Sequence, residues 1–430
     1  MRLPWRIVEP LDSRQFAELR RTAIFECCKY DPQVEDVDTL SPLPLVLAPE
    51  AWAELRGWAQ QLARETMQAE QEILRHPQCW RELGVPWWFR RRLRKFALAP
   101  DPLRHLRLVR FDFHFTTEGW RISEANSDVP GGFNEASGFT RLMAQHYVPL
   151  AVPGDPTLAL ATAIREAAGD GGTVALVHAT AFTDDRQVME YLARQLAGLG
   201  LNPVLAGPDH LRWEGRQAYL DMDGFRGQVD FVFRFFPTEW LPALPRRCAW
   251  WHLLGASETP LCNPGSTILT QTKRFPLVWD QLAAALPAWR SLLPLTCDPR
   301  QAESRLAGKG RVLKPALGRV GDMIKLDGVT RPKEARRIER AARRFPREWV
   351  AQQRFEAVPL VGPTGELFPC IGVYTLNERV IGAYGRVARQ PLIDHLAQDA
   401  AVLIAPNVSL RPGLELNSHE SNRTLQPVGA

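Results

Sequence analysis

The stretch VRFDFHFTTEGWRISEAN, residues 109–126, is the part of the sequence that decides the fold. Apolar and polar residues alternate on both of its arms, which is typical of half-buried strands. Residues 117–119 fit a three-residue hairpin loop, because the glycine at its end readily adopts the left-handed conformation that such a loop needs. The sequence therefore predicts a β-hairpin in which Thr116 pairs with Trp120.

The predicted register places Asp112 opposite Glu124 and Arg110 opposite Asn126. Because side chains alternate between the two faces of a strand, all four project from one face. Two facing carboxylates repel each other unless a positive group lies between them, and Asp, Glu and Asn supply the oxygen ligands that Mg²⁺ prefers. The pattern is compatible with a magnesium site; the alternative is an exposed polar face on which Arg110 forms ordinary salt bridges.

The hairpin and the residues after it resemble the signature of glutathionylspermidine synthases. This chain has RFD at 110–112 and EANSDVP at 124–130, where that family has roughly RFD and EYNADTP at the same spacing. The resemblance implies that Asp112, Glu124 and Asn126 bind Mg²⁺. It also implies that Arg110 contacts substrate or phosphate beside the metal.

Five further segments resemble motifs of the same family and follow in the same order. They are TDDR at 183–186 leading into EYL at 190–192, FRFFPTEW at 233–240, TKRFPLVW at 272–279, VLKPALGRVG at 312–321 and WVAQQRF at 349–355. The likeness therefore extends over about residues 15–405.

The family fold is ATP-grasp, which holds a nucleotide between two α+β lobes. Two lysines of this fold reach the nucleotide phosphates, and the resemblance assigns these roles to Lys273 and Lys314. It places Gln352 and Gln353 on the strand whose edge holds the adenine. Most ATP-grasp proteins have the lysines before the metal ligands; here the metal hairpin comes first, which agrees with the permuted order of the family.

The segment after Lys314 resembles the phosphate loop of the family, KPxxGREG. Gly318 and Gly321 would let backbone amides approach the phosphates, and Arg319 would hold them as a catalytic residue. Val320 stands where the family has glutamate, which removes one charge from the loop.

The fold class that we expect is α/β (α+β), a permuted ATP-grasp architecture with a pre-ATP-grasp-like βαβ lobe. Strands at 173–177 and 201–205 with a helix between them predict that lobe. We expect four parts: an N-terminal helical region with the metal-binding hairpin (1–150), the pre-ATP-grasp-like α/β lobe (151–265), the nucleotide-binding lobe (266–405) and a loose tail (406–430). Helical patterns lie at 12–25, 49–74, 139–147, 273–286 and 332–345.

The residues that contact substrates in the family differ here. The hydroxyl residues that help to seat glutathione are replaced by VPGG at 129–132, which favours a different carboxylate or amine. The late arginine of the family has two candidates, Arg386 and Arg389. Asp184 and Asp185 are candidates for holding a cationic polyamine, and helix N-capping is the alternative.

The composition indicates an ordinary globular protein of 430 residues with a formal net charge of +5. That charge is too small to indicate a nucleic-acid partner. The basic-aromatic cluster at 87–95 predicts a helix whose aromatic residues pack while its arginines stay solvated, and nucleic-acid binding is the alternative. No apolar run approaches the length of a membrane span, and the first residues lack the apolar core of a signal peptide. Seven scattered cysteines favour reduced thiols and a cytoplasmic location.

The chemistry that these residues imply is the joining of a carboxylate to an amine. Carboxylates do not react with amines at neutral pH, and ATP removes this obstacle by forming an acyl phosphate. We therefore expect an ATP- and Mg²⁺-dependent amide ligase that takes a small-molecule or peptide carboxylate and an amine, with a polyamine as one candidate. Arg110 would stabilise the developing charge as a catalytic residue. The alternative is a nucleotide-binding protein without ligase activity.

Overall fold

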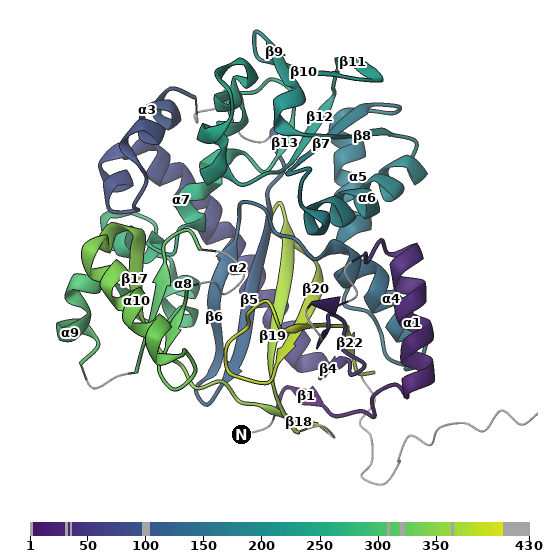
Figure 1. The fold of residues 1–430 in the computed structure, drawn as a ribbon, viewed down its shortest axis with the longest axis vertical. Coiled ribbons are helices and arrows are strands. Elements are labelled where there is room, and N and C mark those ends of the chain that lie inside the picture. Colours follow the sequence, from purple (N-terminus) through teal and green to yellow (C-terminus); the bar gives the residue numbers. More distant parts are fainter. Residues whose placement is uncertain are drawn as a thin grey trace, which may run out of the picture.

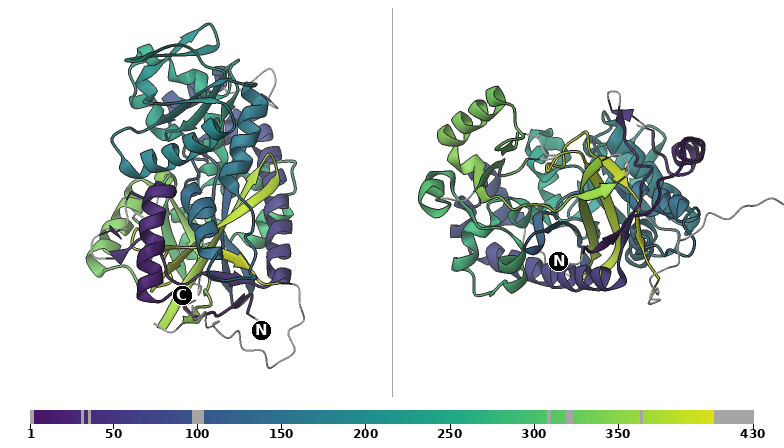
Figure 2. Two further views of the ribbon diagram at one scale, coloured as in Figure 1. Left: turned by 90° about the vertical axis from the view of Figure 1, so that its right-hand side faces the viewer. Right: turned by 90° about the horizontal axis from the view of Figure 1, so that it is seen from below.

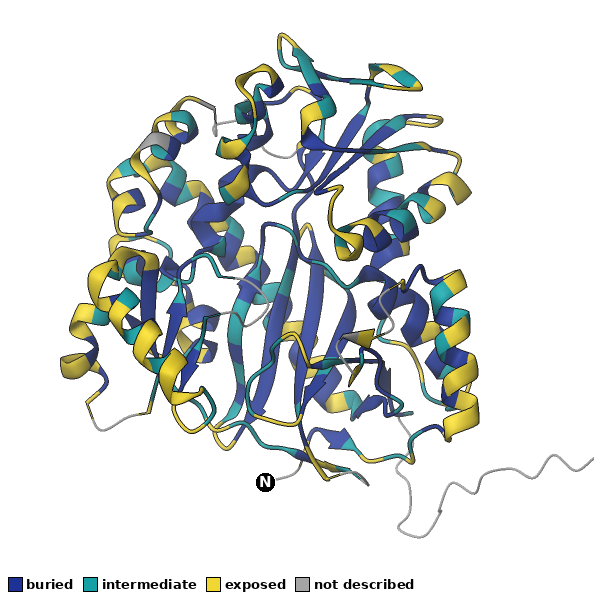
Figure 3. Ribbon diagram, viewed as in Figure 1, coloured by how far each residue is buried: buried dark blue, intermediate teal, exposed yellow. Residues whose placement is uncertain are grey.

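The structure is a computed structural model that describes residues 3–30, 33–34, 37–96, 104–307, 310–318, 323–362 and 365–406. It contains several separate sheets with helices packed around them, so the expected mixed α/β class is confirmed (Figure 1). Figure 3 shows that the strands in the middle of the molecule are buried, whereas exposed residues gather on the outer faces of the helices.

A six-stranded antiparallel sheet forms the centre, in the order β21-β20-β19-β5-β6 with β18 paired to β19. Its strands are β5 (Leu108–Thr116), β6 (Gly119–Asn126), β18 (Leu360–Gly362), β19 (Gly365–Leu376), β20 (Arg379–Ala388) and β21 (Gln398–Ala400). The predicted hairpin is thus completed by strands from the C-terminal part of the chain. The sheet joins the segments that we expected as 1–150 and 266–405, because β5 pairs directly with β19.

The hairpin pairs Asp112 with Glu124 and Arg110 with Asn126 as predicted, but its turn differs from the prediction. Thr116 pairs with Gly119 instead of Trp120, so the loop holds two residues. A β-bulge at Ser123 then shifts the register by one residue, and Asp112 again lies opposite Glu124.

Helix α2 (Pro49–Arg75) covers one face of the central sheet, behind it in Figure 1. Its apolar residues recur at helical spacing, and they pack against the apolar face of the hairpin, to which Phe111 and Phe113 belong. Trp289 of α8 (Pro287–Leu292) packs on Phe111 at 6.1 Å between ring centroids. The polar face of the hairpin is therefore turned away from this core.

The expected βαβ unit is present in a second, parallel sheet at the top of Figure 1. Its order is β13-β12-β7-β8, with helices α5 and α6 beside it, and the elements are β7 (Thr173–His178), β8 (Asn202–Ala206), β12 (Phe231–Phe235), β13 (Leu261–Cys262), α5 (Pro156–Ala168) and α6 (Thr183–Gly198). A small antiparallel sheet follows β8, made of β9 (Leu211–Glu214), β10 (Gln217–Met222) and β11 (Phe225–Gln228). β7 and β12 are almost wholly buried, as the continuous apolar runs of parallel strands predict.

A third sheet lies beside β6, in the order β14-β17-β15-β16. It consists of β14 (Thr296–Cys297), β15 (Arg311–Pro315), β16 (Lys325–Leu326) and β17 (Trp349–Gln353), and α9 (Ala302–Arg305) and α10 (Pro332–Arg344) accompany it. Ile338 of α10 and Leu313 of β15 belong to its own small core. Figure 2 shows this unit to one side of the central sheet.

The remaining α-helices and strands, with one π-helix, lie around these sheets. They are α1 (Ser13–Glu26), α3 (Trp87–Phe96), a π-helix (Asn134–Phe139) continued by α4 (Thr140–Ala144), α7 (Ile268–Gln271), β1 (Trp5–Arg6), β2 (Gln33–Val34), β3 (Val37–Asp38), β4 (Leu45–Leu47) and β22 (Val402–Ile404). All seven cysteines are free and buried, as expected. In the described ranges, no helix combines the length and the apolar character needed to cross a membrane.

The helix predicted over 273–286 is wrong. The chain leaves α7 at Thr272 in an extended conformation and continues as a 3-10 helix from Phe275 to Gln281. Arg274 is fully buried, and its guanidinium donates to the carbonyl oxygens of residues 82, 346 and 349 and to Asp298. These long-range contacts, with Pro276 lacking an N–H, outweigh the local helical pattern.

Candidate active site

A cavity of about 380 Å³ lies between the central sheet, the β15–β17 sheet and the first turn of α6. It brings together most of the predicted site residues: Arg110, Asp112, Glu124, Asn126, Asp184, Asp185, Lys273, Lys314, Gly318, Gln352, Gln353 and Arg386 all line it. Arg389 is exposed and is not part of the lining. The predictions for Arg319 and Gly321 fall outside the described residues.

Asp112 and Arg110 form an ion pair on the polar face of β5. Arg110 donates from Nε to Asp112 Oδ1 at 2.7 Å and from Nη2 to Oδ2 at 3.0 Å. Asn126 donates from Nδ2 to the same Oδ2 at 3.0 Å. The predicted alternative, an exposed polar face, does not hold, because Asp112 is only 7% exposed and all three side chains line the cavity.

Glu124 faces the lysine that the resemblance assigned to the phosphates. Lys273 Nζ lies 3.0 Å from Glu124 Oε2 and donates to the carbonyl oxygen of Gly318 at 2.9 Å. Burial opposes ionisation of Glu124, but the attraction of Lys273, followed by those of Lys314 and Arg110, lowers its pKa to about 2. The Glu124 carboxylate is therefore charged at neutral pH.

Lys314 reaches the hairpin from β15. Its Nζ donates to Gln352 Oε1 at 2.8 Å and to the carbonyl oxygen of Ser123 at 3.3 Å. Burial lowers the pKa of Lys314 to about 8, against the opposing attraction of Glu124. Gln352 also donates to Thr296 Oγ1 at 2.9 Å, so its side chain holds the lysine in place from the cavity wall.

The bulge residue Ser123 brings a further side chain to this wall. His114 follows Asp112 on the same face of β5 and approaches Ser123 Oγ with Nε2 at 3.0 Å. Burial, and next the nearby Lys314, lower the pKa of His114 to about 4, so the imidazole is neutral at neutral pH.

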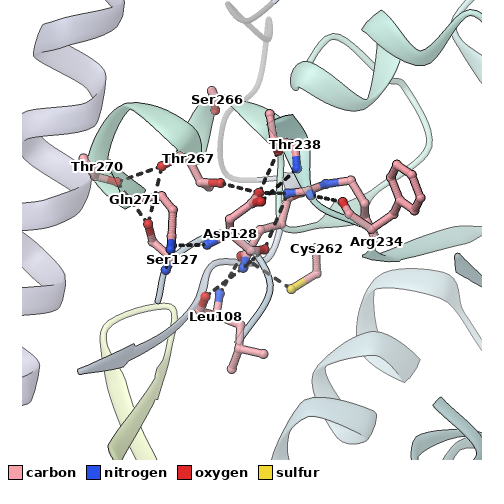
Figure 4. A network of polar contacts seen from close by, with 12 residues as sticks. Leu108, Ser127, Asp128, Arg234, Thr238, Cys262, Ser266, Thr267, Thr270 and Gln271 are labelled. Carbon is pink, nitrogen blue, oxygen red and sulfur yellow. Dashed lines mark hydrogen bonds and ion pairs between the residues drawn. The ribbon is translucent and has the colours of Figure 1, made fainter. Parts of the chain in front are cut away.

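The end of β6 is fixed by a buried polar network around Asp128, drawn in Figure 4. Arg234 donates to Asp128 Oδ1 at 2.5 Å, and both side chains are fully buried. Thr238 donates from its backbone N–H and its hydroxyl to the same carboxylate, and Thr267 donates at 3.2 Å. Gln271 Oε1 accepts the backbone N–H of residues 127 and 128. Asp128, a member of the signature, is thus a structural residue that holds the hairpin against the second sheet.

Two of the tentative substrate residues lie at the start of α6. Asp184 and Asp185 are in its first turn, and the N-cap is Phe182, which makes no side-chain capping bond. Neither aspartate is therefore the N-cap residue, and both line the cavity. Arg386 lines it from β20 and donates to the carbonyl oxygen of Asp394.

Four residues that the sequence did not suggest line the far end of the cavity: Lys29, Glu135, Tyr384 and Asp399. They come from the segment after α1, the π-helix, β20 and β21. Their side chains form ion pairs and hydrogen bonds with one another. No local spacing links segments so far apart, although alternation along β20 does put Tyr384 on the same face as Arg386.

The donor set on the hairpin suits a hard divalent cation. Asp112 and Glu124 are neighbouring carboxylates, Asn126 adds an amide, and Asp112 Oδ1 accepts only one of the hydrogen bonds described above, which leaves it acceptor capacity. Over the described part of the chain, His, Cys, Asp and Glu alone form no cluster of three that would hold a metal ion. A site at the hairpin would therefore need Asn126 or solvent to complete it.

The comparisons with known proteins give matches among solved structures only. No protein-family model and no curated protein sequence matches the chain. Among the solved structures that match is a provisionally named gamma-glutamylcysteine synthetase from Methylobacillus flagellatus KT. The two are 15% identical over 76% of this chain and 83% of that chain, with a TM-score of 0.41. A likeness at this level does not bear on function.

Proposed function

We propose that this protein is an ATP- and Mg²⁺-dependent carboxylate–amine ligase of glutathionylspermidine synthase-like, permuted ATP-grasp architecture. One observation carries the proposal. The carboxylates of the hairpin and the two lysines, from three separate segments, converge on one cavity, with Lys273 at 3.0 Å from Glu124 and Lys314 at 3.3 Å from the backbone of Ser123.

The residues that line the cavity suit both the phosphates and the base of a nucleoside triphosphate. Lys273 and Lys314 are cations at the boundary between the β15–β17 sheet and the hairpin, where they would bind phosphate oxygens. Val312, Ile324 and Leu326 give the same part of the cavity an apolar lining that suits a nucleobase. We assign Gly318 to the phosphate loop, and Arg319 and Gly321 to phosphate contact on the sequence resemblance alone.

Asp112, Glu124 and Asn126 would hold Mg²⁺, which neutralises phosphate charge during transfer when it is bound. Lys273 forms an ion pair with Glu124, and Arg110 forms one with Asp112. Binding of a metal-nucleotide would let Lys273 turn from the carboxylate to a phosphate without leaving Glu124 uncompensated.

We assign Arg110 to the reacting carboxylate. Its guanidinium lies between Asp112 and the carbonyl oxygen of Gly131, and it stacks over the Tyr384 ring at 5.1 Å from the centroid. A fixed guanidinium at this position stabilises negative charge on an acyl group without reorganisation. Arg386 would orient the same substrate from β20, and the cavity wall formed by the two sheets would limit access of water.

The alternative, a nucleotide-binding protein without ligase activity, predicts the same lysines but needs no activated acyl group. Hydroxylamine separates the two, because it traps an activated carboxylate as a hydroxamate whatever the natural amine. The test supplies the protein with ATP, Mg²⁺, hydroxylamine and a pool of amino acids, short peptides and small carboxylic acids, and it measures ADP and hydroxamate.

We expect hydroxamate to form together with ADP, which will equal or exceed it because amines in the pool compete with hydroxylamine. Both should be lost when Mg²⁺ or the carboxylate pool is omitted. Nucleotide binding without any hydroxamate across the pool would favour the binding protein. ADP release that does not need a carboxylate would contradict the proposal as well, because it would indicate a simple ATPase.

A further inference from the structure

Lys29 is a buried lysine at the far end of the cavity, remote in sequence from every predicted site residue. Cys28, directly before it, has a left-handed φ of 55°, and this turn directs the chain from the end of α1 toward the cavity. The Lys29 N–H donates to the carbonyl oxygen of Ala23 at 3.1 Å, which fixes the backbone. The backbone of Lys29 is therefore fixed by its own segment, independently of the contacts of its side chain.

The ammonium group of Lys29 lies between two buried carboxylates. Its Nζ is 2.6 Å from Glu135 Oε1 and 3.1 Å from Asp399 Oδ2, and the three side chains are 6%, 6% and 11% exposed. Tyr384 donates its hydroxyl to Asp399 Oδ1 at 2.5 Å. Glu135 belongs to a π-helix, a rare conformation that is frequent at functional sites.

The charges at this end of the cavity balance. Lys29 and Arg386 supply two positive charges, and Glu135 and Asp399 supply two negative ones; Arg386 and Asp399 are cross-strand partners on β20 and β21. Another ammonium group entering here would add a positive charge with no carboxylate to receive it. Without Lys29 the same residues would carry one net negative charge, which suits one ammonium.

We propose that Lys29 determines which amines the enzyme accepts, an inference that rests on the proposed ligase function. Its ammonium group fills the position between Glu135 and Asp399 that the second ammonium of a diamine or polyamine would otherwise occupy. The acceptor is therefore an amine without a second cationic group, instead of the polyamine that the sequence resemblance suggests.

The aspartates at the other side of the cavity do not replace this position. At the start of α6, Asp184 is exposed and Asp185 is half-buried. A carboxylate that water reaches holds an ammonium group only weakly because the solvent screens the pair. Glu135 and Asp399 are buried, so a cation between them is desolvated and bound more strongly.

The first experiment tests the ammonium position without using activity. Lys29→Ala is compared with the wild type by thermal unfolding in n-butylammonium chloride and in sodium chloride at equal ionic strength. We expect butylammonium to raise the Tm of Lys29→Ala by at least about 2 °C over sodium chloride and to leave the wild type unchanged. No difference between the salts for a cooperatively folded Lys29→Ala would overturn the proposal.

Lys325→Ala is a matched control. Lys325 also bridges two carboxylates, Asp327 at 2.9 Å and Glu339 at 2.8 Å, but outside the cavity, and the Asp327 side chain is 58% exposed. Butylammonium should not stabilise this variant more than sodium chloride does. Equal stabilisation of both variants would indicate non-specific binding and would overturn the proposal.

The second experiment supplies the same pool of carboxylates to every reaction. It measures the increase in ADP release on addition of one pool of monoamines and amino acids or of one pool of diamines and polyamines. We expect the wild type to use the monoamines and amino acids. In Lys29→Ala, ADP release with diamines and polyamines, relative to that with monoamines and amino acids, should rise at least about tenfold. Efficient use of diamines by the wild type would overturn the proposal. No ADP release with either pool, alongside butylammonium binding by Lys29→Ala, would overturn the ligase function and leave Lys29 as the occupant of an ammonium position.

If Lys29→Ala does not fold in sodium chloride, recovery of folding replaces the Tm shift as the readout. The variant keeps both buried carboxylates, so an ammonium ion between them would compensate for the lost lysine. We expect n-butylammonium chloride to restore a cooperative unfolding transition, and absence of this recovery would overturn the proposal.

Discussion

Asp112 and Asp128 belong to the same sequence signature, yet the structure places them in opposite situations. Asp128 is fully buried, and the partners of its carboxylate, Arg234, Thr238 and Thr267, do not line the cavity. Asp112 faces the cavity, and its partners Arg110 and Asn126 line the same cavity. A carboxylate whose partners are fixed supports the fold, whereas one whose partners face a ligand is available for chemistry.

Replacing Asp112 should have the largest effect on turnover. Asp112→Asn removes one of the two carboxylates proposed for the metal and leaves Arg110 without its ion-pair partner. We expect hydroxamate formation to fall at least about 10³-fold, with cooperative unfolding retained. The measurement pairs the hydroxamate rate with a thermal unfolding curve, and a folded variant with more than about a tenth of wild-type turnover would contradict the metal assignment.

Replacing Asp128 should instead act on stability. Asp128→Asn leaves Arg234 as a buried charge without compensation, so we expect the free energy of unfolding to fall by about 3 kcal/mol. Asp280→Asn is the matched control, because Asp280 and Arg290 form an ion pair of similar length, 2.8 Å, with side chains 84% and 44% exposed. Its loss should cost less than about 1 kcal/mol.

Urea unfolding of both variants, followed by tryptophan fluorescence, checks this difference. Similar losses in the two variants would show that the network of Figure 4 does not hold the hairpin as described. It would also remove the distinction between Asp112 and Asp128.

The hairpin shows how far local pattern predicts a site. Alternation along β5 and β6 gave the face and the pairs correctly, although the turn at Thr116 was one residue shorter than predicted. The bulge at Ser123 compensated for that error, and nothing in the sequence marks the bulge, because a serine also fits a regular strand. The pairs of Asp112 and Arg110 were therefore predicted correctly, although the predicted turn was wrong and the bulge was not foreseen.

Long-range contacts account for what local pattern missed. The segment after Thr272 has helical periodicity, but buried Arg274 ties it to three other segments, and it forms a 3-10 helix instead. Lys29 and Asp399 could not be predicted either, because they meet only after the chain has folded back over most of its length. Motif resemblance supplied Lys273 and Lys314, which spacing alone would not have joined to the hairpin.

The smallest effect that we expect is on the pH dependence of ATP affinity, through Lys314. It tests the same difference between a cavity residue and a residue of the buried network. Unlike Arg234, which an aspartate neutralises, Lys314 donates to the neutral oxygens of Gln352 and Ser123, and burial lowers its pKa to about 8. A bound triphosphate favours the charged lysine, so ATP affinity should fall as the pH rises through 8, by about tenfold between pH 7 and pH 9.

Titration of Mg²⁺-ATP at several pH values measures this slope. Lys314→Arg should flatten it, because arginine stays protonated over that range; an unchanged slope in this variant would show that a group other than Lys314 senses the phosphates.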